Sequence, residues 1–237
     1  SFGLFLNKRR TIIKKIFGVL IGEKPKVVVG FDGKKASEVL KEKFIEGLIL
    51  CGVNVVDIDI LPAPVVYYSV SHFDCEAGAC ISGSDFNGVT SIKFMLNNEP
   101  LTGQDIENFT GVLKDGVSVS GFKKGVVNEI DITETYITEV LNTLKFKPEK
   151  SLKVGIDCLN GSAAIVLEDM AARLPFKLVL RNTSLEKKPS NPDQFLEENI
   201  QNIHNFIEEE SLDFAFNIDT DGKKIVGVTR QGKILYG

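Results

Sequence analysis

Short apolar runs alternate with amphipathic segments along the first half of the chain. Lys26–Phe31 (KVVVGF) and Asn54–Ile60 (NVVDIDI) are rich in β-branched residues, a pattern typical of buried strands. Between them, Ser37–Cys51 carries apolar residues three and four positions apart, which predicts a helix that ends at Gly52. Because a helix links the two strands, we expect parallel pairing with a right-handed crossover.

The same reasoning predicts the other elements of this half. We expect helices at Thr11–Ile21, Val65–Phe73, Gly103–Leu113 and Asp131–Leu144, and strands at Ala77–Ile81 and Ser91–Leu96. Asp131 or Thr133 is the predicted N-cap of the last of these helices. The strand at Ala77–Ile81 runs into Ser82-Gly83-Ser84-Asp85, which predicts a tight polar turn at the carboxyl end of a strand.

After a polar segment that contains a proline, Phe146–Leu152, the pattern starts again. We expect strands at Lys153–Cys158, Phe176–Leu180 and Phe214–Ile218, helices at Ala163–Arg173 and Phe195–Glu210, and a hairpin at Ile225–Thr229 and Lys233–Leu235. The sequence therefore predicts the α/β class, as two consecutive three-layer α/β/α domains with mixed, mostly parallel sheets. We place the domains at residues 1–147 and 148–237, and we expect the second to extend further because the pattern still continues at Gly237.

Composition narrows the functional classes. The chain has 237 residues, of which 43% are hydrophobic and 25% charged, as in ordinary soluble proteins, and no apolar run is long enough to cross a bilayer. The net charge of −4 argues against nucleic acid as a partner, and basic residues interrupt any signal-like segment, so we expect a cytoplasmic protein without a membrane partner. The four cysteines form no CxxC pair, so we expect buried free thiols.

Two segments of the first half carry candidate chemistry. Ser84, in the predicted turn, is placed to act as a nucleophile or phosphate carrier. Lys93, on the strand that follows, is placed to assist proton transfer or bind phosphate. Taken alone, each is also compatible with an ordinary polar turn or a surface lysine.

A third segment lies after the strand Phe214–Ile218. Asp219 and Asp221 can converge on one Mg²⁺ ion, which favours a few carboxylates together with phosphate oxygen. Lys223 and Lys224 follow directly and can neutralise these carboxylates or hold a phosphate as point charges. A turn with a charged rim is the alternative.

Taken in order, these segments resemble the α-D-phosphohexomutase family, which includes phosphomannomutases and phosphoglucomutases. The stretch from KVVVGFDGKKASEVL to its Pro-x-Pro turn is similar to the family's opening, GACISGSD to its phosphoserine loop, and IKFMLNNEPLTGQDI to the segment after that loop. KVGIDCLNGSA is similar to the start of the second domain, and FAFNIDTDGKKIVGVTRQGKILYG to the metal loop D-x-D-x-D-R with its hairpin. The resemblance runs from about Lys26 to Gly237 and covers the first two of the family's four domains.

The resemblance implies a phosphotransferase-type isomerase of carbohydrate metabolism, in which a phosphoserine donates its phosphate to a hexose phosphate and recovers one from another position. It implies Ser84 as the phosphoserine and a metal ligand, Lys93 in proton transfer, and Asp219 and Asp221 as ligands of Mg²⁺. It also implies glucose 1,6-bisphosphate as a primer. Phosphate-binding roles are expected for Lys34, Lys223 and Lys224.

The sequence departs from the family pattern at several of these positions. Lys223 stands at the third metal aspartate and Lys224 at the following arginine, while Asp85 and Phe86 replace a histidine and an asparagine after the serine. An ammonium group in place of a ligand repels Mg²⁺, so we expect weak metal affinity. The family's sugar-recognition and distal-phosphate loops have no counterpart, so we expect this chain alone to turn over poorly and to need C-terminal domains or a partner chain.

Two hypotheses follow. The chain is part of a phosphohexomutase, or it is a degenerate homologue that binds sugar phosphates or another protein without catalysis. A generic nucleotide-binding domain is disfavoured, because neither GxGxxG nor GxxxxGK[ST] occurs.

Overall fold

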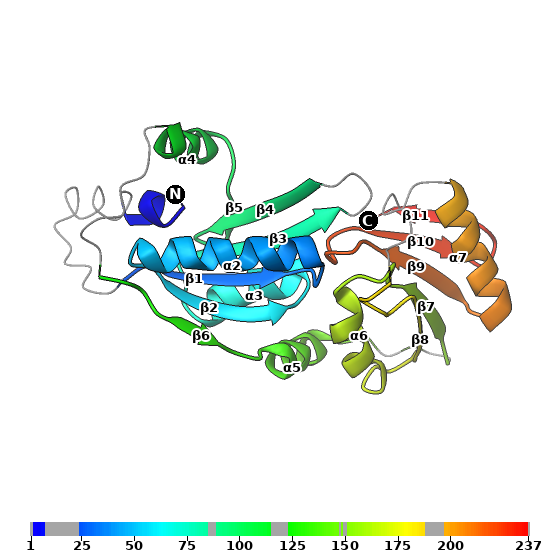
Figure 1. The fold of residues 1–237 in the computed structure, drawn as a ribbon. Helices are drawn as coiled ribbons and strands as arrows, with labels where there is room; N and C mark the ends of the chain where they lie inside the picture. Colours follow the sequence, from blue (N-terminus) through cyan, green and yellow to red (C-terminus); the bar gives the residue numbers. More distant parts are fainter. Residues whose placement is uncertain are drawn as a thin grey trace.

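Two open sheets, each with helices packed on it, make up the protein in this computed structural model (Figure 1). The structure describes residues 2–7, 24–84, 89–114, 123–146, 148, 151–187 and 197–236. The predicted helix Thr11–Ile21 lies outside the described residues.

The first sheet has the order β5-β4-β3-β1-β2-β6, in which β3, β1, β2 and β6 run parallel, β4 is antiparallel to β3, and β5 is antiparallel to β4. Alternate residues of β1 face opposite sides, because Val27 and Val29 pack with α2 and residues 2–7, whereas Val28 packs with α3 and α5. This gives three layers. The strands are β1 Lys26–Phe31, β2 Asn54–Ile60, β3 Ala77–Ser84, β4 Val89–Leu96, β5 Glu99–Pro100 and β6 Val127–Glu129, and the helices are α2 Lys35–Leu50, α3 Ala63–His72, α4 Gln104–Lys114 and α5 Thr133–Thr143.

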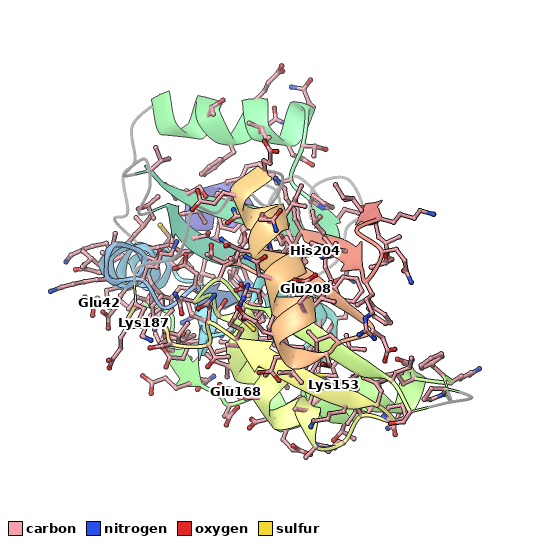
Figure 2. The ribbon with its side chains drawn as sticks, turned by 90° about the vertical axis from the view of Figure 1, so that its right-hand side faces the viewer. Glu42, Lys153, Glu168, Lys187, His204 and Glu208 are labelled. Carbon is pink, nitrogen blue, oxygen red and sulfur yellow. The ribbon has the colours of Figure 1, made fainter. Side chains whose placement is uncertain are left out.

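The second sheet has the order β11-β10-β9-β7-β8 and repeats part of the first. Its strands β9, β7 and β8 run parallel, β10 is antiparallel to β9, and β11 is antiparallel to β10, as in the part of the first sheet formed by β3, β1, β2, β4 and β5. Figure 2 shows α7, with His204 and Glu208, across one face of this sheet, where Ile203 and Phe206 pack on Ala215. The elements are β7 Lys153–Asp157, α6 Ala163–Ala171, β8 Lys177–Arg181, α7 Glu197–Glu210, β9 Phe214–Ile218, β10 Ile225–Thr229 and β11 Ile234–Tyr236.

The two units share one apolar cluster. Val166 and Met170 of α6 pack in the same cluster as Ile132 and Ile137 at α5. At the rim of this cluster, both Glu134 oxygens accept hydrogen bonds from Arg173 Nη1 at 2.9 Å. The junction is therefore an apolar contact with a charged edge, and the two units adjoin along it (Figure 1).

Most of the predicted elements are present. The predicted limits of β1, β2, β9 and β10 are those observed, and the predicted fold class is confirmed. The short strands β5 and β6 were not predicted. All four cysteines are free and buried, as predicted. Among the described residues, no helix combines the length and the apolar character needed to cross a membrane.

Candidate functional site

An ion pair joins the two sheets at the centre of the predicted site. Lys93 on β4 donates a hydrogen bond from Nζ to Oδ2 of Asp221, in the turn between β9 and β10. The Asp221 side chain is only 5% exposed. Burial by itself would lower the pKa of Lys93, but the hydrogen bond and negative charge of Asp221 outweigh that effect and raise it. Lys93 is therefore an ammonium ion at neutral pH that neutralises a buried carboxylate.

The turn that carries Asp221 also rests on the first unit through its backbone. The Asp221 carbonyl oxygen accepts a hydrogen bond from the Ala63 N–H at 2.9 Å, at the first residue of α3. Gly222 has a φ of 74°, and a Cβ there would lie 2.9 Å from Cβ of Pro62. Glycine is thus needed both for the left-handed backbone and for the close approach to Pro62.

Asp219, the other predicted metal ligand, holds the turn together. Its Oδ1 accepts hydrogen bonds from the backbone N–H groups of Lys223 at 2.5 Å and Lys224 at 2.9 Å. Burial and the nearby charge of Asp221 raise the pKa of Asp219 to about 6, against the lowering effect of these two hydrogen bonds. One of its oxygens is therefore committed to the turn.

The two lysines after this turn are exposed and cationic. Lys223 Nζ lies 5.7 Å from the centre of the Tyr67 ring, on α3. Lys224 joins the turn through its backbone, because its carbonyl oxygen accepts a hydrogen bond from the Asp219 N–H at 3.0 Å. The structure thus places Lys223 and Lys224 beside Asp219 and Asp221, as the sequence order requires.

Lys34, predicted to bind phosphate, lies beside the serine strand. Its Nζ donates a hydrogen bond to the carbonyl oxygen of Gly83 and lies 3.9 Å from Oδ2 of Asp32. Asp32 is buried and accepts a hydrogen bond from the Gly83 N–H at 2.8 Å. Both backbone polar groups of Gly83 are therefore held, and Lys34 and Asp32 fix the backbone next to Ser84.

The predicted tight turn at Ser82–Asp85 is wrong in its first three residues, because β3 continues to Ser84, which pairs with Val89 of β4. The antiparallel pairing with β4 supplies hydrogen bonds that extend the strand beyond its apolar run. Asp85 and Phe86 lie outside the described residues. Figure 1 shows this end of the β3–β4 hairpin pointing toward the second unit.

The two sheets place Ser84 and Asp219 at equivalent positions. A buried aspartate stands at the end of the central strand of each sheet, Asp32 directly after β1 and Asp157 as the last residue of β7. The residue before each aspartate pairs with Ile81 of β3 in the first sheet and with Phe216 of β9 in the second. Ser84 follows Ile81 by three residues, and Asp219 follows Phe216 by three residues. The register separates Ser84 from Lys93, however, because Lys93 pairs with Cys80, four residues or roughly 13 Å away along β3.

Sequence reasoning missed two polar residues at the start of α2. Asp32 was given no role, and Ser37 was taken only as the start of a helix. Ser37 is fully buried, and a Cβ on Gly83 would lie 3.0 Å from its Oγ. The Ser37 hydroxyl has no hydrogen-bond partner among the described residues. The sequence signal for these residues was a serine, Ser37, in the first turn of a helix that follows Asp32-Gly33.

The donors at this junction do not fit a Mg²⁺ ion. Among the described residues, no group of three His, Cys, Asp or Glu side chains is arranged to hold a metal ion. Asp221 is ion-paired with Lys93, Asp219 accepts two backbone hydrogen bonds, and the third position of the motif is Lys223. The turn instead combines the ammonium group of Lys93, paired with Asp221, with two exposed lysines, Lys223 and Lys224, and lysine binds phosphate as a point charge.

A separate cavity of about 580 Å³ lies at the ends of β2 and β6. Its lining includes Asp57, Asp59 and Glu129, and its lysine, Lys41, lies 3.0 Å from Asp57 and 3.2 Å from Asp59. Because that lysine is paired with two acids, the cavity presents less positive charge to a phosphate than the junction does.

In open α/β sheets, ligands bind outside the carboxyl ends of the parallel strands, and the Lys93–Asp221 junction lies at that edge of both sheets. The fold is thus that of a two-unit α/β protein with lysines and aspartates gathered where the two sheets meet. Family models for the phosphoglucomutase/phosphomannomutase α/β/α domains match it, domain I over residues 7–110 and domain II over residues 134–232. The chain therefore belongs to the phosphoglucomutase/phosphomannomutase family, as the resemblance of its motifs predicted.

Named relatives agree with this assignment. A phosphomannomutase/phosphoglucomutase of Pseudomonas putida is 28% identical over 218 residues, which cover 90% of this chain and 46% of that protein. A phosphoglucomutase/phosphomannomutase of Thermococcus kodakarensis is 27% identical over 238 residues, 93% of this chain and 51% of that protein. The chain thus spans about half the length of the curated relatives it matches.

A solved structure supports the fold. The chain superposes on a phosphoglucomutase/phosphomannomutase family protein from Burkholderia thailandensis with a TM-score of 0.76 and 23% sequence identity. The match covers 90% of this chain and 48% of that one.

Proposed function

We propose that this chain carries the phosphoryl-transfer centre of a phosphohexomutase, with Ser84 as the residue that bears the phosphate. Family membership supports the reaction class. The observation that carries the proposal is the ion pair between Lys93 and Asp221, because it links the hairpin that bears Ser84 to the Asp219–Lys224 turn. The substrate in this proposal is a hexose phosphate, and glucose 1,6-bisphosphate is the primer.

The transfer step exchanges one phosphorus–oxygen bond for another. The bond from phosphorus to the Ser84 oxygen breaks, and a bond to a hydroxyl oxygen of the sugar forms. The proton of that hydroxyl ends on the Ser84 oxygen, and Lys93 relays it by giving one proton to the serine and taking up the proton that the sugar releases. Since Lys93 and Ser84 are held roughly 13 Å apart along one ladder, the proton passes between them through hydroxyl groups of the bound sugar or through water, and not by direct contact.

Two further points belong to the same proposal. We keep the domain boundary between residues 147 and 148, which lies between the last strand of the first sheet and the first strand of the second. We also propose a cytoplasmic location, and that segments equivalent to the unmatched half of the relatives complete the substrate site, on the same chain or on a partner.

Labelling of Ser84 tests the proposal. The chain is incubated with glucose 1,6-bisphosphate, and intact-mass analysis followed by peptide mapping locates any added phosphoryl group. We expect one group on Ser84 in the parent chain and in Ser82→Ala, a matched control two residues earlier on β3, and none in Ser84→Ala. If the parent chain stays unlabelled, the mutase proposal is wrong, and the alternative of a homologue that binds without catalysis is favoured.

A further inference from the structure

Among the described residues, the turn Asp219–Lys224 lacks the three carboxylates that the family's metal motif requires, and two lysines follow its two aspartates. We propose that lysine ammonium groups, Lys223 together with Lys93, take the place of the divalent cation at this phosphoryl-transfer site. This inference rests on the proposed function and specifies how its charge is supplied.

The charge balance of the substitution is the first argument. The family motif D-x-D-x-D has a carboxylate of charge −1 at the position of Lys223, whose ammonium carries +1. The replacement changes the local charge by +2, which equals the charge of one Mg²⁺ ion. A phosphate placed at this junction therefore meets the same net charge without the ion as it would meet with the ion and a third aspartate.

The occupancy of the two remaining carboxylates is the second argument. Binding Mg²⁺ through Asp221 would require the buried carboxylate to exchange its ion pair with Lys93 for the metal. Binding through Oδ1 of Asp219 would compete with the hydrogen bonds that this oxygen accepts from the backbone N–H groups of Lys223 and Lys224. Both exchanges cost free energy, because buried charges and N–H groups that lose their partners are destabilising.

The location of the ammonium groups is the third argument. Lys93 approaches Asp221 from the first unit, whereas Lys223 extends from the second unit over the Tyr67 ring. Each unit therefore contributes one cation to the junction. A Mg²⁺ site requires its ligands in near-octahedral positions. A lysine binds phosphate as a point charge on a flexible side chain, so the exposed Lys223 can meet a phosphate without such fixed geometry.

Calorimetric titration of the full chain with MgCl₂ tests the metal part directly, without any catalysis. We expect weak binding by the parent chain and binding tighter by about tenfold or more in Lys223→Asp, which restores the aspartate order 219, 221 and 223. The matched control is Lys233→Asp, the same change of charge on an exposed lysine of the β10–β11 hairpin, which should bind Mg²⁺ like the parent. Tight binding by the parent that Lys223→Asp does not improve would overturn the inference.

Phosphoryl transfer from glucose 1,6-bisphosphate to Ser84 supplies the second test, run once with MgCl₂ and once with a chelator. We expect the same extent of labelling in both buffers and less of it in Lys223→Ala. Labelling that occurs only with MgCl₂ would overturn this inference and leave the proposed function standing. Absence of labelling in both buffers would overturn the proposed function, and this inference with it.

Discussion

Ser37 and Ser162 are two buried serines with opposite hydrogen-bonding states. The Ser162 hydroxyl donates to the Thr220 carbonyl oxygen at 3.2 Å, whereas the Ser37 hydroxyl has no partner among the described residues. A buried hydroxyl without a partner costs about 1–3 kcal/mol. We therefore expect Ser37→Ala to leave the free energy of unfolding unchanged or to raise it by about 1 kcal/mol, as measured by urea denaturation.

Ser162→Ala provides the contrast. It removes one hydrogen bond and should lower the free energy of unfolding by about 1 kcal/mol. A loss of similar size in Ser37→Ala would mean that the Ser37 hydroxyl does have a partner in the folded protein. Reduced labelling of Ser84 in Ser37→Ala, with stability intact, would identify that hydroxyl as a group that positions the strand carrying Ser84.

Asp32, a buried residue, holds the backbone of β3 beside Ser84. It is buried, accepts hydrogen bonds from the backbone N–H groups of Gly83 and Lys34, and lies 3.9 Å from the Lys34 ammonium. In Asp32→Asn an amide replaces this carboxylate, so we expect the free energy of unfolding to fall by about 2–3 kcal/mol. Asp59→Asn is the control, because the Asp59 side chain is 74% exposed, and it should change stability by less than about 0.5 kcal/mol. Equal effects in a urea titration would contradict the assigned role of Asp32.

At the scale of the elements, burial decides which parts of the fold were predictable. The strands β1, β2, β9 and β10 are apolar runs in or beside the sheet centres, so their limits follow from the sequence. The strands β5 and β6 have two and three residues, all exposed, so they carry no hydrophobic pattern and depend on pairing with β4 and β2. Tertiary pairing likewise extends β3 past its apolar run to Ser84.

The site was predictable only in part, for a similar reason. Asp219, Asp221 and Lys223 lie within five consecutive residues, so their presence in one turn follows from the sequence alone. The contact of Lys93 with Asp221 does not, because it forms between two separate sheets. Nor does the contact of Lys34 with Gly83, which depends on the neighbouring positions of β1 and β3.

The start of α5 tests a cap predicted from sequence. The predicted N-cap at Asp131 or Thr133 is wrong, because Ile132 occupies that position and its side chain makes no capping hydrogen bond. Oδ1 of Asp131, one residue earlier, nevertheless accepts a hydrogen bond from the Thr133 N–H at 2.9 Å, and this bond lowers the pKa of Asp131 below its ordinary value of 3.8. A group with a depressed pKa stabilises the fold above its ordinary pKa and loses that effect as pH falls through the folded-state value. We expect Asp131→Ala to lower stability by about 1 kcal/mol at neutral pH.

The pH dependence of this effect separates the cap from a general packing change. In urea denaturation at a series of pH values, the difference between Asp131→Ala and the parent should shrink below pH 3.8, where the carboxylate takes up a proton. Asp131→Asn is the matched control, because its amide oxygen accepts the same hydrogen bond, so it should retain most of the stability. A deficit in Asp131→Ala that stays constant down to low pH would contradict the role given to the Asp131–Thr133 hydrogen bond.

At the scale of the whole molecule, the apolar cluster shared by α5 and α6 couples the two units. Met170 on α6 is buried in that cluster, so Met170→Ala should lower the free energy of unfolding by about 2–4 kcal/mol. Hydrogen exchange measured by mass spectrometry should show lower protection in peptides of both α5 and α6. In Ile203→Ala, a control in the separate cluster under α7, the loss should be concentrated in the second unit. Loss of protection in α6 alone after Met170→Ala would contradict the coupling.

The chain contains the reacting centre of the proposed mutase but matches only about half of the relatives, so its two activities should separate. Transfer of a phosphate to Ser84 needs the two units described here, whereas rapid turnover also uses binding energy from parts of the substrate remote from the reacting phosphate. We therefore expect this 237-residue chain to become labelled at Ser84 by glucose 1,6-bisphosphate while interconverting glucose 1-phosphate and glucose 6-phosphate slowly. Single-turnover labelling and steady-state turnover, measured on one preparation with Ser84→Ala as the blank, test this separation. Turnover as fast as labelling would show that the two units bind the whole substrate, and the contribution proposed for further segments would then be wrong.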